Sequence, residues 1–338
     1  MDVIPQPPNP WEIDPAAFPH DGDEADKLRF LIRFALLAPS TRNTQPWRFR
    51  VTDGQVEIHL DLSRWQRVAD ADQREMHISI GCALENLLIA ATHYGYRTAA
   101  DGIASCGHPT LVARIRFTPH DVPPPSVGDP RFDAMRRRRT EHGVYDGTPV
   151  ADQDLAALSE VCLEPGLRLD WITDDARRHA VDALVMRADA LLLSRPDYRQ
   201  ELGDLIGTGA FGAPWLLAIV GRFAVAHLMS TSSFAKTDHQ VLASSPVLGV
   251  VSAHIGSREA QVRVGQVLER LYLETTIRSL SLQPVSQILQ TDDTREALAA
   301  LLPEPGWVPL QPLRLGRAAP HEARTPRRSV DEVMMPGD

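Results

Sequence analysis

Residues 38–49 read Ala-Pro-Ser-Thr-Arg-Asn-Thr-Gln-Pro-Trp-Arg-Phe and combine the end of a helix, a polar loop and the start of a strand. Upstream, apolar residues recur at helical spacing over residues 28–36 behind a candidate N-cap, Asp23, and Pro39 predicts where that helix ends. Downstream, apolar and charged residues alternate, which predicts a strand. Six polar residues, 40–45, therefore connect a helix to a strand at the edge of a core.

A β-hairpin follows the loop. Asp53-Gly54 is a two-residue turn signal with alternating apolar residues on both sides. Counting outward from this turn predicts the pairs Trp47 with Leu60, Phe49 with Ile58 and Val51 with Val56 on one face, and Arg50 with Glu57 on the other. A polar loop held in this way is placed to touch a ligand, although most polar loops are ordinary connections.

The composition is that of a globular chain without nucleic-acid or membrane partners. The 338 residues are 43% hydrophobic and 23% charged, and the formal net charge of -9 argues against a nucleic-acid backbone as partner. The N-terminus is not that of a signal peptide, and the longest apolar stretch, residues 215–229, carries two basic residues and is shorter than the ~20 residues of a membrane helix. Cys82, Cys106 and Cys162 lack metal spacing and favour buried thiols in a reducing, cytoplasmic setting.

Pattern and composition divide the chain into three parts. Proline-rich residues 1–22 predict an extended arm, and a segment dense in proline and glycine, 120–130, separates a first unit, 23–125, from a second, 126–338. In the first unit we expect a helix over residues 79–96 and a third strand over 110–117. In the second we expect strands at 216–220, 247–252 and 310–315, and helices near 152–162, 175–193 and 259–280.

One helix of each unit carries a similar sequence. Gly81-Cys-Ala-Leu-Glu-Asn-Leu-Leu-Ile-Ala matches Gly265-Gln-Val-Leu-Glu-Arg-Leu-Tyr-Leu-Glu at glycine, leucine, glutamate and leucine, with an offset of 265 − 81 = 184 residues. Shared helical propensity alone could produce one such match. Together with the mixed order of helices and short strands, the match favours an α+β fold that occurs twice in the chain.

The densest positive charge in this acidic chain lies at residues 136–139, four arginines followed by Thr140-Glu-His142. An arginine run is most often a solvated basic patch. Forked guanidinium donors beside a threonine hydroxyl are also what a bound phosphate requires. Near the C-terminus, Arg314-Leu-Gly-Arg317 and Thr325-Pro-Arg-Arg328 add further cations.

Other chemistries find little support. Residues 207–212 spell Gly-x-Gly-x-x-Gly, but a predicted helix precedes them and a predicted strand follows, which reverses the order of a dinucleotide-binding fold. We interpret them as a mobile glycine loop. The twelve histidines show no metal-ligand spacing, and no Gly-x-Ser-x-Gly motif is present, so neither a metal site nor acyl transfer is indicated.

The motif Pro-Ser-x-x-Asn-x-Gln-Pro-Trp at residues 39–47 resembles the signature loop of the nitroreductase superfamily, whose members are FMN-dependent. In that family one half of a dimer lays this loop against the flavin bound to the other half. The resemblance extends over the arginine run, the Gly265 helix and the tail at 325–328, and it is closest to the two-unit Acg-like branch. It implies a nitroreductase-like α+β fold duplicated within one chain, an intramolecular pseudo-dimer.

This resemblance implies one complete flavin site, because the first unit has only acidic residues 21–26 where a phosphate motif should stand, and the second has no second signature loop. His142 departs from the family pattern, in which a permanent cation is usual, and Arg328 is preferred to Arg327. The backbone N–H of Ser286 corresponds to the donor that points at flavin N5. The implied FMN-binding residues are Pro39, Ser40, Thr41, Asn43, Arg138, Arg139, Thr140, His142, Pro284, Val285, Ser286, Arg317, Arg327 and Arg328.

The implied activity is electron transfer from NAD(P)H through the flavin to a nitro group, a quinone or a similar small acceptor, with no obligatory side-chain acid or base. The chain would be a monomer with an internal pseudo-dimer, or a homodimer. One alternative is an FMN-binding or storage protein whose flavin is covered by a lid, at residues 198–212 or 230–239. Another is a structural relic without flavin.

Overall fold

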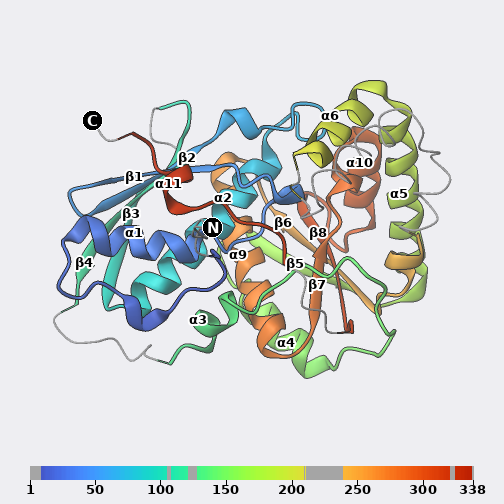
Figure 1. The fold of residues 1–338 in the computed structure, drawn as a ribbon. Helices are drawn as coiled ribbons and strands as arrows, with labels where there is room; N and C mark the ends of the chain where they lie inside the picture. The colour runs from blue at the N-terminus through green and yellow to red at the C-terminus, as the bar shows by residue number, and fades with distance from the viewer. Residues whose placement is uncertain are drawn as a thin grey trace, which may run out of the picture.

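In the computed structural model, residues 9–104, 108–120, 128–208, 210, 239–319 and 324–336 are described. Their strands form two four-stranded antiparallel sheets, ordered β1-β2-β4-β3 and β5-β6-β8-β7, so the second repeats the order of the first (Figure 1). The strands are β1 Trp47–Thr52, β2 Gln55–Leu60, β3 Tyr96–Ile103, β4 Leu111–Pro119, β5 Leu167–Ile172, β6 Val247–Ala253, β7 Ser281–Pro284 and β8 Val308–Gly316. The predicted duplicated α+β fold is confirmed.

Helices cover the sheets and fill the space between them (Figure 1). With the labels of Figure 1, they are α1 Glu24–Ala35, α2 Arg74–His93, α3 Pro130–Met135, α4 Asp152–Glu160, α5 Asp175–Ser194, α6 Pro196–Gly207, α9 Arg258–Ile277, α10 Asp292–Leu301 and α11 Val330–Val333. None of the helices in the described ranges combines the length and apolarity that crossing a bilayer would require.

The two units meet where α2 crosses α9, at the glycines of the repeated sequence. A Cβ added to Gly81 would lie 2.0 Å from the carbonyl oxygen of Val262, and one added to Gly265 would lie 2.0 Å from that of Ile78. These two contacts are equivalent in the repeat. Adding the offset of 184 residues to Ile78 and Gly81 gives Val262 and Gly265. A pseudo-twofold axis therefore passes between these glycines, and close backbone approach is the reason for glycine at both.

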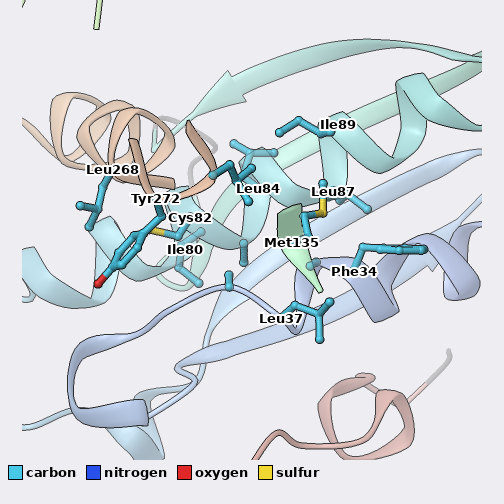
Figure 2. Packing of buried hydrophobic residues seen from close by; sticks show 14 of the residues in the cluster. Phe34, Leu37, Ile80, Cys82, Leu84, Leu87, Ile89, Met135, Leu268 and Tyr272 are labelled. Carbon is cyan, nitrogen blue, oxygen red and sulfur yellow. The ribbon is translucent and has the colours of Figure 1, made fainter. Parts of the chain in front are cut away.

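Around this crossing, one hydrophobic core extends across both units (Figure 2). Leu268 and Tyr272 of α9 lie against Ile80 and Cys82 of α2, and Phe34 of α1 lies on the first-unit side. Both Cys82 and Cys162 are buried free thiols, whereas Cys106 lies outside the described residues.

The first hairpin has the predicted register, with Trp47 opposite Leu60, Phe49 opposite Ile58 and Val51 opposite Val56. The apolar face decides this register, because Trp47 and Phe49 have no exposed surface. In the second unit the corresponding strands β5 and β6 are not joined by a turn. Residues 173–246, which include α5 and α6, are inserted between them.

Several predicted elements change position. The strand expected at 110–117 is the fourth, since β3 precedes it, and β5 and β7 have no counterpart among the predictions. Helix α2 begins at Arg74 rather than at 79, because the Asp70 carboxylate accepts the N–H groups of Glu75 and Met76. It ends at His93 rather than at 96, while the strand expected at 216–220 lies outside the described residues.

The C-terminal segment, residues 324–336, returns to the first unit. Met334 pairs in parallel with Phe49, and the N–H of Met335 donates to the carbonyl of Phe49 at 2.7 Å. In Figure 1 the red tail with α11 accordingly lies beside the blue strand β1. The tail thus covers the edge of the first sheet and carries its basic residues toward the loop that precedes β1.

Candidate functional site

The polar loop between α1 and β1 has an unusual backbone. Around its 3₁₀ turn, Thr41–Asn43, the φ angles of Arg42, Asn43 and Gln45 are 49°, 56° and 49°, a left-handed region that costs non-glycine residues free energy. Local contacts hold this shape, including the N–H of Gln45 donating to the Ser40 hydroxyl at 2.9 Å. Strain of this kind in a polar loop indicates a function beyond connection.

This loop and the C-terminal tail bind each other through amide side chains. Asn43 and Gln45 both donate to the carbonyl of Pro326, at 3.0 and 3.3 Å, and Gln45 accepts the N–H of Arg328 at 2.8 Å. The guanidinium of Arg327 donates to the Asn43 side chain at 2.8 Å. Two segments more than 280 residues apart in sequence are therefore one structural unit.

Beside this unit, three guanidiniums gather on the ring of Trp11. The central guanidinium carbons, Cζ, of Arg138, Arg324 and Arg327 lie 6.0, 4.7 and 4.6 Å from the centroid of this ring. The Trp11 ring N–H donates to the carbonyl of Thr325 at 2.9 Å, which fastens the N-terminal arm to the tail. With Arg139, whose charge acts on Arg324, these residues form what we call the arginine cluster: Arg138, Arg139, Arg324 and Arg327.

The arginine cluster has buried donors without acceptors. Within the described part of the chain, Nε of Arg138, Nη1 of Arg324 and Nε of Arg327 have no hydrogen-bond partner. Burial, and then the neighbouring Arg138, hold the pKa of Arg327 well below its usual range. A buried unpaired donor costs about 1–3 kcal/mol, so an anion bound here would remove several unfavourable contributions at once.

The charge of the cluster fits a phosphate monoester. Glu269 lies 3.7 Å from Nε of Arg138, and Glu141 lies 4.0 Å from Nε of Arg139. Four guanidiniums and these two carboxylates leave an excess of two positive charges in the described part of this region. A phosphate monoester carries a charge of about −2 at neutral pH and would be attracted to this excess.

The predicted phosphate residues do not all join the cluster. Arg328, which the sequence favours over Arg327, donates instead to the Asp61 carboxylate at 3.3 Å and to the carbonyl of Glu332 at 2.6 Å. Thr140 lies beneath Arg138, because its hydroxyl bonds the Tyr272 hydroxyl at 2.9 Å and Arg138 lies over that ring. Arg317 donates to the carbonyl of Ser279, at the end of α9.

The other predicted residues form a second group around β7 and β8. His142 and Gln283 are in contact at 2.9 Å, and Gln283 accepts from the buried Arg314 at 2.6 Å. Pro284 ends β7, the N–H of Val285 donates to Pro312, and the Ser286 hydroxyl accepts from Gln311 at 3.4 Å. Arg314 also donates to the carbonyls of Glu141 and Gly143, so this second group is joined to the arginine run.

Helix α6 of the insertion lies against the signature-like loop. The Arg42 guanidinium donates to the Tyr198 hydroxyl and lies 5.1 Å from its ring centroid. The Glu201 carboxylate accepts two first-unit N–H groups, of Val68 and Ala69, at 3.0 and 2.9 Å. Beyond α6, the carbonyl of Ala210 accepts from the Asn43 amide at 2.7 Å.

This contact bears on the two predicted lid segments. Of the first segment, Tyr198 and Ala210 touch the loop, whereas 209, 211, 212 and 230–238 lie outside the described residues.

Sequence reasoning missed three contributors to this site. Trp11 stands in a proline-rich arm that predicts no fixed contact, and Arg324 lies one residue before the basic tail motif. Glu269 had a signal, because the repeat matches it with Glu85, and a glutamate shared by two apolar helices is typical of a specific buried role.

No family model matches the chain. A protein of Mycobacterium tuberculosis named "Putative NAD(P)H nitroreductase Rv3131" is 27% identical over 95% of this chain and 94% of its own length. Another from the same organism, "Putative NAD(P)H nitroreductase acg", is 28% identical over 91% of this chain and 95% of its own.

The chain is similar, over almost its whole length, to mycobacterial Acg-like proteins of the nitroreductase superfamily. Among solved structures, the FMN-dependent nitroreductase NfnB of Mycobacterium smegmatis in complex with NADPH aligns with a TM-score of 0.44 and 15% identity, over 63% of this chain and 100% of that one. In this chain the signature-like loop comes from the first unit and the arginine run from the second. The two lie close together, since Arg138 donates to the carbonyl of Leu37, two residues before the motif, at 2.7 Å.

Proposed function

We propose that this Acg-like chain is an FMN-dependent oxidoreductase that takes electrons from NAD(P)H and reduces a nitro group, a quinone or a similar flat acceptor. The observation that carries the proposal is the arginine cluster, with its unpaired buried donors, beside the strained loop of residues 39–45. The names of the two mycobacterial relatives support the NAD(P)H donor and the class of acceptor.

The donor set of the arginine cluster fits the phosphate of FMN. Guanidiniums prefer phosphate oxygens because two N–H groups can bind side by side, and each charge-assisted bond contributes about 1.5–3 kcal/mol. Arg138, Arg324 and Arg327 each have a buried N–H that makes no hydrogen bond within the described chain, and all three guanidiniums lie at the ring of Trp11.

Bound FMN would supply the hydride and electron chemistry, and the chain would supply binding and orientation. The loop residues Ser40, Thr41 and Asn43 are proposed to contact the ring, held in place by the tail. The turn of Pro284, Val285 and Ser286 is proposed to place its backbone donor near N5. His142, which bonds Gln283, would join this second group rather than grip the phosphate directly.

A second candidate function is flavin binding or storage without turnover. The observation that favours it is the attachment of α6 to the loop, through Tyr198, Glu201 and the carbonyl of Ala210. If these contacts persist, a nicotinamide would not reach the flavin ring. If they open, α6 is a gate that an enzyme can use.

Anaerobic stopped-flow reduction separates the two functions. An oxidoreductase is bleached by NADPH or NADH, and an added quinone or nitroaromatic restores the yellow colour. A store is bleached by dithionite and not by nicotinamides. The variant Glu201→Ala removes the acceptor of two first-unit N–H groups, and Gln200→Ala, at an exposed position of the same helix, is its control.

If Glu201→Ala gains nicotinamide reduction that both the wild type and Gln200→Ala lack, the chain is a covered store. Rapid reduction in all three proteins supports the enzyme.

A further inference from the structure

Glu269 is a buried carboxylate with poorly satisfied oxygens. It lies one turn after Gly265 on α9, and its side chain has no exposed surface. In the described parts of the chain neither oxygen accepts a hydrogen bond of good geometry, although the Asn86 side chain acts on the carboxylate as a weak donor, and Oε1 lies 3.7 Å from Nε of Arg138, too far for a strong bond. Burial of a carboxylate in this condition is costly unless its charge is compensated or removed.

The glutamate at the equivalent position of the first unit has different hydrogen-bond and ion-pair partners. Glu85, 184 residues earlier on α2, is also buried, but it accepts from Gln266 at 3.0 Å and has Arg270 at 3.9 Å. Arg270 also forms an ion pair with Glu164. The first-unit glutamate thus has partners outside the proposed phosphate site, whereas the charged partner of Glu269 is Arg138, an arginine of that site.

The groups that face Glu269 come from every element packed on it. They are Cys82, Glu85 and Asn86 of α2, Arg138 of the loop after α3, and Arg327 of the tail. Burial, together with the charge of Glu85, raises the pKa of Glu269 to about 7, even though Arg138, Asn86 and Arg327 act in the opposite direction. The carboxylate can therefore change protonation near neutral pH.

We propose that Glu269 is the exchangeable counter-ion of the arginine cluster: it is ionised beside Arg138 without phosphate, and it binds a proton from solvent when a phosphate monoester takes over that arginine. This inference rests on the proposed function, because FMN is the phosphate monoester concerned. It adds that the site couples flavin binding to proton uptake.

The sign of the coupling follows from the charges. A bound phosphate adds negative charge near Glu269 and so raises the pKa of its carboxyl further. Binding then takes up a proton at pH values between the free and the bound pKa, and affinity falls as pH rises through that window, by at most about tenfold per pH unit. At pH 8 the phosphate, whose second pKa is about 6, is fully ionised and contributes no proton change of its own.

Isothermal titration calorimetry can measure the number of protons taken up per FMN bound. Full-length, flavin-free protein is titrated with FMN at pH 8 in two buffers of different ionisation enthalpy, and the difference in the heat of binding gives this number. We expect the wild type to take up a substantial fraction of one proton and Glu269→Gln to take up none. Glu85→Gln is the matched control and should retain the uptake, with a midpoint displaced to lower pH because a repelling charge is lost. Riboflavin, which has no phosphate, should bind without uptake.

FMN binding without proton uptake in the wild type would overturn the inference and leave the proposed function intact, as would the same uptake in Glu269→Gln. If neither FMN nor inorganic phosphate binds the wild type, both fail. The comparison of FMN with riboflavin in the wild type keeps the test valid even if Glu269→Gln does not fold.

Discussion

Gly81 of α2 and Gly265 of α9 lie against each other so closely that a Cβ on either would stand 2.8 Å from the Cα of the other. Each would also stand 2.0 Å from a backbone carbonyl oxygen, which a rigid helix cannot move aside. The two halves of the duplicated fold are thus joined at a contact that only glycine permits.

Gly81→Ala should therefore destabilise the whole protein, although alanine is the better helix former by about 1 kcal/mol. Overpacking a crossing of this kind typically costs about 1–3 kcal/mol, and here the clash is with backbone on both sides. Urea unfolding measures the change. Gly143→Ala is the control, because its added Cβ meets no atom within 4 Å; an equal effect in both variants would contradict the account of the crossing.

The sequence predicts most where local pattern and burial agree. The hairpin register follows from Asp53-Gly54 and the apolar face that Phe49 shares, and the duplication follows from Gly81 and Gly265. Strand β3 was missed because Tyr96–Ile103 lacks alternation and is largely exposed. Its position is fixed by pairing with β4, a long-range contact that no local pattern encodes.

The candidate site shows the same limit. The motifs identified the loop and the arginine run, but not which of Arg327 and Arg328 lies beside Arg138. That choice depends on Asp61, which bonds Arg328, and on Trp11, which lies under Arg327. Both come from distant segments, so only the folded chain brings them together.

Arg138→Ala should cost about 3–5 kcal/mol of stability, because it leaves the buried Glu269 without its ion-pair partner. The double variant Arg138→Ala/Glu269→Gln should recover much of that loss. Chemical denaturation of the two single variants and the double variant at pH 8 gives the coupling free energy. Additive effects would mean that the 3.7 Å contact between these side chains has no energetic role.

Asp61 should make the tail attachment sensitive to acid. Burial raises the pKa of this carboxyl, but the Ser63 hydroxyl, Arg48 and Arg328 together hold it below its usual value. A depressed folded-state pKa gives stability that is present above the unfolded-state pKa of about 4 and is lost as pH falls below it. Asp61→Asn should therefore melt below the wild type at pH 7, and the difference in Tm should shrink between pH 4 and pH 3. A difference that does not change with pH would exclude this linkage.

Saturation with FMN should give one flavin per chain. Among the described residues, three left-handed non-glycine residues cluster in the loop before β1 and in no other loop. The place of Glu269 in the other half holds Glu85, which accepts from Gln266 and pairs with Arg270. Flavin absorbance against protein concentration, after removal of unbound FMN, measures the ratio. Two flavins per chain would show that the second half retains a site.

The most direct test of the central claim, that the arginine cluster binds the phosphate of FMN, is the ratio of FMN to riboflavin affinity in Arg327→Ala and Arg328→Ala. Loss of the Arg327 donors should weaken FMN about tenfold or more and leave riboflavin unchanged. Arg328→Ala should lower stability and keep the wild-type ratio, since its donors go to Asp61 and Glu332. If the ratio is unchanged in Arg327→Ala, or falls only in Arg328→Ala, the arginine cluster is not the phosphate site.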